Sequence, residues 1–150
     1  MTNVDIVAKI TDAEWEIMRV VWAQKETTSK EVTNILNSKT EWKTTTVKTL
    51  LSRLVDKKML GTKPLGNKFI YFPIVEERQS IDALSEDILT KICSRKVGTF
   101  VETILSESLL SFEDIEKIEK LLQEKRKTAV EKVPCNCTPG QCQCHLQKEL

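Results

Sequence analysis

The sequence predicts a mainly α-helical protein in which one short β-hairpin separates two groups of amphipathic helices. Only four glycines, four prolines and 5% aromatic residues occur among 150, a composition that favours helices joined by short loops. Apolar residues recur at helical spacing on both sides of the hairpin. The third observation is a tail in which four of the five cysteines fall within ten residues. At this length we expect one ordinary domain or two very small ones.

Several classes of protein are not expected. No apolar run approaches the roughly 20 residues that span a bilayer, and the first ten residues lack the pattern of a signal peptide, so we expect a cytoplasmic protein with no membrane partner. An enzyme is not expected either. The chain has a single histidine, His145, and it shows neither a nucleophile–base motif nor a phosphate-binding glycine loop.

Two helices are predicted at the start of the chain. Thr11 and Glu14 have the spacing of a capping box, which begins a helix that continues to about Ala23. Thr28 and Glu31 repeat this signal for a short second helix. Its expected buried side consists of Val32, Ile35 and Leu36.

A third helix is predicted from about Lys43 to Lys58. Its apolar stripe consists of Val47, Leu50, Leu51, Leu54 and Val55. The opposite face carries Thr45, Thr49, Ser52 and Asp56, flanked by Lys48 and Arg53. Hydroxyls bond phosphates or base edges, and an arginine makes bidentate contacts with bases, so this face indicates DNA binding. Residues 44–46 are threonines in the first turn, where backbone N–H groups favour a phosphate, although Thr44 fits equally well as an N-cap.

The charge distribution supports this interpretation. The formal net charge of +1 combines 12 Lys/Arg and 8 Asp/Glu in residues 1–75 with 11 and 14 in residues 76–150. Residues 43–68 contain seven basic residues and one acid. By itself such an excess of basic residues more often marks a solvated surface. It supports DNA binding here because the predicted third helix carries part of it.

A β-hairpin is predicted after the third helix. Gly66 and Asn67 lie between two β-prone runs, which is a two-residue turn signal, and Lys63 and Lys68 flank the tip. Three helices followed by a basic β-ribbon describe a winged helix-turn-helix, whose third helix enters the major groove while the wing follows the DNA backbone. A purely structural hairpin is the alternative. The predicted DNA-binding residues are Lys43, Thr44, Thr45, Thr46, Lys48, Thr49, Ser52, Arg53, Lys63 and Lys68.

The second group of helices predicts a dimerisation region. Its apolar stripes are Ile81, Leu84, Ile88 and Ile92, then Phe100, Ile104 and Leu105, and, after Ser111, Ile115, Ile118, Leu121 and Leu122. These faces are too large for so small a unit to bury, so we expect a homodimer on a pseudo-palindromic operator. Cys93 is expected to be a buried packing residue. The predicted divisions are a DNA-binding domain (1–74), a helical dimerisation domain (75–132) and a cysteine-rich metal-binding tail (133–150).

The tail contains the motif C-x-C-x4-C-x-C. Its candidate metal ligands are Cys135, Cys137, Cys142 and Cys144. Pro139 and Gly140 predict a type II turn that folds the two pairs toward each other. Four thiolates suit Zn(II) in a closed tetrahedral site and also soft Cu(I), and the spacing, unlike that of zinc ribbons, points toward a cluster able to hold copper. A redox dithiol switch and an intersubunit disulfide remain alternatives, and His145 is either a further ligand or an exposed neighbour.

Three segments carry a resemblance to a known family. They read DAEWEIM followed by VW in residues 12–22, EWK leading into TVKTLLSRL in residues 41–54, and FIYFP in residues 69–73. Over about residues 8–125 the chain resembles the winged-helix repressors of β-lactamase and methicillin-resistance genes. The cysteine-rich ending resembles the copper-responsive branch of that family, the CopY-type repressors of bacterial copper-export operons.

The resemblance implies a homodimer that binds double-stranded operator DNA in its Zn(II) form and represses a copper-export operon. It also implies that Cu(I), delivered by a copper chaperone, is the inducer, because it displaces zinc from the four tail cysteines. One alternative is an antibiotic-resistance-type repressor of the same family, which is switched by proteolysis. The other is a cytosolic copper-binding or storage protein, which would leave the threonine-rich helix and the wing unexplained.

Overall fold

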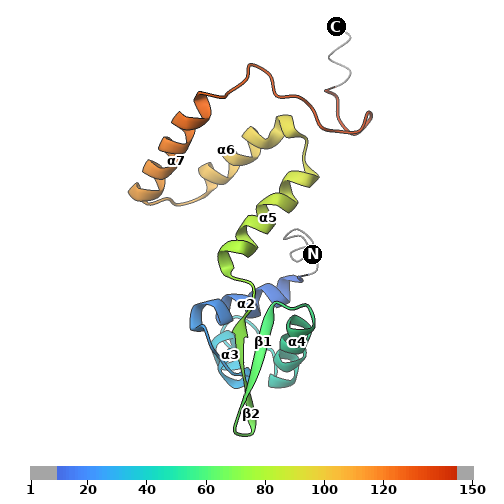
Figure 1. Cartoon of the computed structure of the whole chain (residues 1–150), viewed down its shortest axis with the longest axis vertical. Coiled ribbons are helices and arrows are strands. Elements are labelled where there is room, and N and C mark those ends of the chain that lie inside the picture. The colour runs from blue at the N-terminus through green and yellow to red at the C-terminus, as the bar shows by residue number, and fades with distance from the viewer. Residues whose placement is uncertain (1–9, 145–150) are drawn as a thin grey trace. The chain divides into compact units, whose positions relative to one another are not determined.

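A computed structural model describes residues 10–144 of the chain (Figure 1). The backbone divides into two compact units, Met1–Asp87 and Ile88–Leu150. The division falls within helix α5 (Glu77–Lys91), which is continuous. The mainly helical fold class with one small β-hairpin is therefore confirmed.

The first unit begins with three helices, α2 (Asp12–Gln24), α3 (Ser29–Leu36) and α4 (Thr44–Asp56). Two of them start at the predicted caps, since the Thr11 and Thr28 hydroxyls each accept a hydrogen bond from a backbone N–H three residues later, at 3.2 Å. The N-cap of α4 is Lys43, which makes no side-chain cap bond. Thr44 is thus the first helical residue and not the N-cap.

The buried core of this unit comes from all three helices and from the segment that leads into the hairpin. It consists of Ile17, Met18, Val20, Val21, Val32, Leu36, Val47, Leu50, Leu51, Leu54, Met59 and Leu60. Val55 is only half-buried against it. Ile35 is 45% exposed, so its predicted burial is wrong. A two-turn helix buries one narrow side, and Val32 and Leu36, four residues apart, already occupy it.

The hairpin pairs β1 (Leu60–Leu65) with β2 (Lys68–Pro73) in antiparallel register, with Leu65 opposite Lys68 at the tip. Gly66 has φ +64, a value that glycine adopts without the steric cost met by other residues. Thr27 adds an isolated bridge to Tyr71 through two backbone hydrogen bonds of 2.8 and 3.0 Å. The bridge ties the start of α3 to the wing, and no local sequence signal predicted it.

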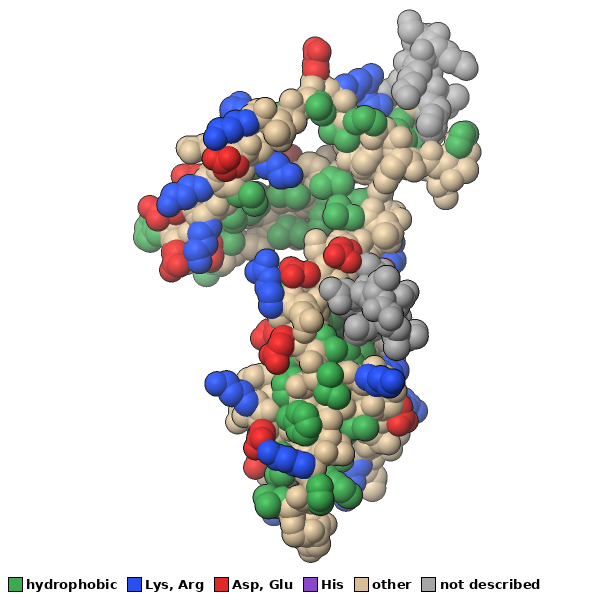
Figure 2. Space-filling view, viewed as in Figure 1, with side chains coloured by type: hydrophobic (Ala, Val, Ile, Leu, Met, Phe, Trp, Pro, Cys, Tyr) green, Lys and Arg blue, Asp and Glu red, His purple; other side chains and the backbone are tan. Residues whose placement is uncertain are grey.

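The second unit contains the end of α5, a short 3-10 helix η1 (Ser94–Lys96), α6 (Val97–Glu107) and α7 (Phe112–Arg126). Ser111 and Asp114 form a complete capping box at the start of α7. Within residues 88–144, Cys93 is the one buried apolar side chain. Figure 2 shows hydrophobic side chains gathered in the hollow between α6 and α7. Among the residues that the structure describes, no helix combines the length and apolar character needed to cross a bilayer.

Candidate metal centre and nucleic-acid interface

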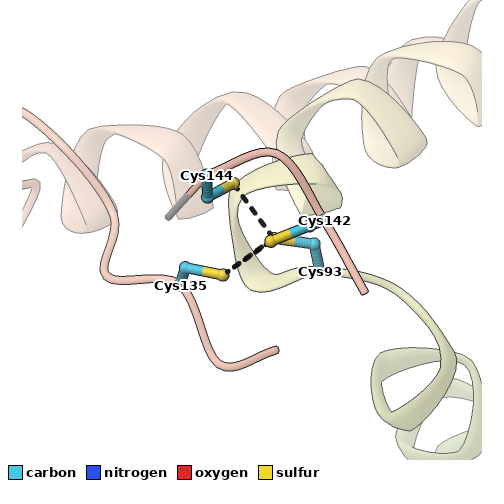
Figure 3. A group of neighbouring side chains, drawn as sticks. All are labelled: Cys93, Cys135, Cys142 and Cys144. Carbon is cyan, nitrogen blue, oxygen red and sulfur yellow. Dashed lines mark hydrogen bonds between the residues drawn. The ribbon is translucent and has the colours of Figure 1, made fainter. Parts of the chain in front are cut away.

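Four cysteine sulfurs converge in the second unit. Those of Cys93, Cys135, Cys142 and Cys144 all lie within 4.8 Å of one another (Figure 3). The sulfur of Cys93 is 3.6 Å from that of Cys135 and 3.8 Å from that of Cys144, and the sulfurs of Cys135 and Cys142 are 3.3 Å apart. An all-thiol donor set of this size suits a soft or borderline metal such as Zn(II) or Cu(I). The residues present therefore fit a metal centre.

The tail reaches this position through a turn and two anchoring contacts. Gln141 N–H donates to the Thr138 carbonyl at 3.0 Å, and Gly140 has φ +98, which confirms the predicted turn between the two cysteine pairs. The Ser94 backbone N–H donates to Asn136 Oδ1 at 2.9 Å, and the Ser94 hydroxyl donates to the Pro134 carbonyl at 2.5 Å. The tail is thus held against the first residue of η1.

The thiols of the metal-free cluster differ in acidity. A hydrogen bond from the Cys135 side chain lowers the pKa of Cys142 to about 6, and a backbone hydrogen bond from Arg95 lowers the pKa of Cys93. Burial raises the pKa of Cys137 to about 12 and that of Cys144 to about 11. Cys142 is therefore the most acidic thiol for which a value is resolved, and the pKa of Cys93 is shifted in the same direction. Because metals bind the thiolate form, occupation of the site releases the protons of the other thiols.

The structure brings together three of the four predicted ligands, Cys135, Cys142 and Cys144, and adds Cys93. The fourth predicted ligand, Cys137, lies outside this set of four sulfurs, although its side chain hydrogen-bonds to those of Cys93, Cys135 and Cys142. Cys93 is buried, as expected of a packing residue, but its sulfur faces the tail thiols. Its 42-residue separation from Cys135 hides this contact from any local pattern. His145 lies outside the described residues.

The predicted DNA-binding residues form an exposed surface of the first unit. The apolar stripe of α4 is directed into the core, so the opposite face is left to solvent. Every predicted residue is exposed: Lys43, Thr44, Thr45, Thr46, Lys48, Thr49, Ser52, Arg53, Lys63 and Lys68. Lys48 and Lys68 line one hollow of about 350 Å³ between α4 and the wing. Ser29, at the start of α3, lines the same hollow. It stands apart from the basic segment in the sequence, so no local pattern indicates it as a DNA-binding residue.

Two of the basic residues in this region are engaged inside the unit. The Lys63 ammonium pairs with Glu26 at 2.5 Å, and both side chains remain about half exposed. The Lys57 ammonium contacts both carboxylate oxygens of the buried Glu14 at 2.7 Å. The described ion pairs of residues 43–68 engage only Lys57 and Lys63, so the positive charge presented by this segment comes from the other five basic residues, Lys43, Lys48, Arg53, Lys58 and Lys68.

Comparison with known proteins places the chain among bacterial repressors. The family model described as penicillinase repressor matches residues 10–124. An uncharacterized 16.5 kDa protein from Latilactobacillus sakei is 34% identical over 140 residues, which cover 93% of this chain and 96% of that protein. The penicillinase repressor of Bacillus licheniformis is 29% identical over 120 residues, which cover 80% of this chain and 94% of that protein. The methicillin resistance regulatory protein MecI of Staphylococcus aureus (strain N315) is 26% identical over 117 residues, covering 78% and 95%.

Solved structures with similar sequences include the DNA-binding domain of the repressor BlaI, at 34% identity, with coverage of 47% of this chain and 87% of that one and a TM-score of 0.44. The CopR repressor structure is 43% identical, with coverage of 45% and 99% and a TM-score of 0.40. The family assignment itself follows from the match over residues 10–124, which is most of the chain. The chain therefore belongs to the penicillinase repressor family of transcriptional repressors.

Proposed function

We propose that this chain is a copper-responsive repressor. As a cytoplasmic homodimer in its Zn(II) form, it binds a pseudo-palindromic operator of a copper-export operon, and Cu(I) releases it by displacing zinc from the cysteine cluster. The observation that carries the proposal is the convergence of thiols from the C-x-C-x4-C-x-C tail in a chain of this repressor family. The resemblance to CopY-type repressors supplies the choice of copper and zinc and a copper chaperone as the Cu(I) donor.

The DNA-binding part of the proposal rests on residues 1–74. The face of α4 that carries Lys48, Thr49 and Arg53 is exposed, and Lys68 lies at the tip of the adjoining wing. Hydroxyls and cations on one exposed helix suit base edges and phosphates. We propose that α4 enters the major groove and that the wing follows the backbone.

The dimer is supported by the apolar surface of the proposed dimerisation domain, residues 75–132. A hollow of about 770 Å³ is lined by α6 and α7, and its walls include Val101, Leu105 and Leu122. Leu122 is 55% exposed and Ile104, on α6, is exposed as well. A monomer gains stability when such a surface is removed from water. A second copy of the same chain supplies an equal surface and doubles the number of DNA-binding units.

The way in which the metal changes DNA affinity is constrained by charge. One Zn(II) with four thiolates has a formal charge of −2, and two Cu(I) ions with four thiolates have the same charge. Geometry is therefore the better cause, because a tetrahedral site and a compact bridged copper cluster place the tail differently. A coupling free energy of roughly 2.7 kcal/mol between metal exchange and DNA binding weakens operator affinity about 100-fold.

Gel-shift titration tests this proposal. The probe is a duplex recovered by in vitro selection with the zinc-loaded protein, and the matched control is a variant with all four tail cysteines replaced by serine. We expect Cu(I) to weaken binding of the wild-type protein by about 100-fold and to leave the variant unaffected. Equal operator affinity with zinc and with Cu(I) would contradict the copper response and favour the antibiotic-resistance-type repressor. Absence of specific binding by the zinc-loaded protein would favour a copper-binding protein.

A further inference from the structure

Cys93 joins the tail thiols from a different part of the chain. It follows the end of α5 by two residues and precedes η1, and it is 7% exposed. Figure 3 shows its side chain directed toward those of Cys135 and Cys144, with sulfur separations of 3.6 and 3.8 Å. Cys93 stands outside the C-x-C-x4-C-x-C motif, which accounts for four of the five thiols in this cluster.

The sulfur separations of Cys93 are close to those of a tetrahedral site. With a Zn–S bond of about 2.3 Å, two ligand sulfurs of a tetrahedron lie about 3.8 Å apart. The separations of Cys93 from Cys135 and Cys144, 3.6 and 3.8 Å, are close to this value, and that of Cys135 from Cys142 is 3.3 Å. The other three pairs of sulfurs lie within 4.8 Å of each other, so one ion binds all four after these side chains move by about 1 Å or less.

We propose that Cys93 is a metal ligand that completes a four-thiolate zinc site with Cys135, Cys142 and Cys144. This inference rests on the proposed function, because it assigns the ligands of the same metal centre. Cys137 is then the neighbouring fifth thiol of the cluster and not one of the four zinc ligands.

The surroundings of the cluster suit a site with excess negative charge. A cavity of about 360 Å³ is lined by Cys93, Cys137 and Cys142 and also by Lys91 and Lys96. Four thiolates around one Zn(II) leave a formal charge of −2, which nearby ammonium groups stabilise. The two lysines belong to α5 and η1, so the basic residues that line this cavity come from the segments that flank Cys93.

A ligand at position 93 gives the metal a direct connection to the helical framework. The Ser94 contacts to Asn136 and Pro134 already hold the tail at this junction. Coordination through Cys93 closes the chain between residues 93 and 135 into a loop that contains α6 and α7. A change of metal then acts on the end of α5, the helix that starts four residues after the wing strand β2. A tail that bound metal alone would lack this connection.

Cobalt substitution of the full-length protein tests the assignment. Thiolate-to-Co(II) charge-transfer absorption counts the bound thiolates, and competition with zinc gives the relative affinity. We expect Cys93→Ser to remove about a quarter of the charge-transfer intensity, one of four thiolates, and to weaken zinc binding by at least about tenfold, since even loss of an outer partner costs about 10–100-fold. The matched control is Cys137→Ser, which makes the same change at the neighbouring thiol and is expected to retain both properties.

Two further measurements distinguish the loss of a metal ligand from a failure of the Cys93 variant to fold. Cys93→Ala is measured beside Cys93→Ser, and far-UV circular dichroism monitors the helices of both. In the wild-type protein, alkylation followed by mass spectrometry reports which thiols zinc protects, and we expect Cys93 to gain protection together with Cys135, Cys142 and Cys144. Unchanged cobalt spectra in both Cys93 variants, equal losses in the Cys93 and Cys137 variants, or zinc protection of Cys137 in place of Cys93 would overturn the assignment.

Failure of this assignment is distinguishable from failure of the proposed function. The cobalt and alkylation measurements contain no DNA, and the release of wild-type protein from the selected duplex by Cu(I) does not depend on which thiols bind zinc. A wild-type protein that releases DNA but binds metal equally well without Cys93 would retain the proposed function and exclude Cys93. A wild-type protein that binds neither Co(II) nor zinc would exclude both.

Discussion

Glu14 takes part both in the cap of α2 and in a buried ion pair with Lys57. It is the N3 residue of α2, where its backbone N–H donates to the Thr11 cap, and it is 1% exposed. Its carboxylate is contacted by Lys57 at 2.7 Å from 43 residues away. Burial of a lone carboxylate is costly, so this pair joins the first helix to the end of α4. The capping pattern predicted the first role, and only the folded chain reveals the second.

Removal of the Lys57 ammonium is expected to destabilise the first unit. Lys57→Ala leaves the Glu14 carboxylate buried without this cation, and we expect the free energy of unfolding to fall by about 2–3 kcal/mol. This is somewhat less than for a fully buried pair, about 3–5 kcal/mol, because Lys57 is 26% exposed. Chemical denaturation measures the change. The matched control is Lys39→Ala, which breaks the more exposed pair with Glu16 and should cost no more than about 1 kcal/mol. Equal effects of the two substitutions would contradict the argument.

At the scale of elements, α4 has one face that packs in the core and an opposite face that is exposed to solvent. Val47, Leu50, Leu51 and Leu54 fix the helix in the core, and the residues between them are exposed. The stripe and its opposite face follow from helical periodicity, so the sequence predicted both. The Lys63–Glu26 pair was not predictable in this way, because it joins β1 to the loop after α2. Lys63, one of the ten predicted DNA-binding residues, is therefore paired with an acid in the protein, and this pair must open before Lys63 contacts a phosphate.

The proposed DNA-binding surface predicts a loss of salt dependence when its cations are removed. Arg53→Ala and Lys68→Ala should each weaken operator binding, and each should reduce the slope of log affinity against log salt by about one. Gel-shift titrations at several salt concentrations measure both quantities. Lys117→Ala, on the exposed surface of α7, is the control and should leave the slope unchanged. An unaltered slope in both test variants would show that α4 and the wing are not the DNA-binding surface.

At the scale of the whole molecule, the two units differ in how they bury apolar surface. The first unit has a core of twelve buried residues, whereas within residues 88–144 only Cys93 is a buried apolar residue. Exposed leucines and isoleucines of α6 and α7 remain in contact with water in the isolated chain. Folding of the second unit is therefore expected to depend on association with a partner copy, and on metal at the cluster.

Disruption of the apolar surface of α7 is expected to separate the proposed dimer. Leu122→Glu places a charge on the hollow that α6 and α7 line, and burying an unpaired carboxylate in an interface opposes association. Light scattering coupled to size-exclusion chromatography should show a monomer at concentrations where the wild-type protein is a dimer. Leu65→Glu, which makes the same change at the exposed tip of the wing, should leave the dimer intact. If both variants remain dimeric, the interface lies elsewhere.

The sequence by itself determined the features that depend on local physics. Helix starts at Thr11, Thr28 and Ser111, the apolar stripe of α4, the hairpin at Gly66 and the turn at Gly140 each follow from a few neighbouring residues. The crowded tail cysteines likewise indicate thiol chemistry from their spacing alone.

Tertiary structure alone decided which distant groups meet. The Glu14–Lys57 pair, the bridge from Thr27 to Tyr71 and the position of Cys93 among the tail thiols all join residues more than 40 positions apart. No periodicity or spacing encodes such contacts, because they depend on how several elements pack at once. The chain therefore carries four clustered cysteines in one short segment, and the fold brings a fifth thiol, from just beyond the end of α5, into the same cluster.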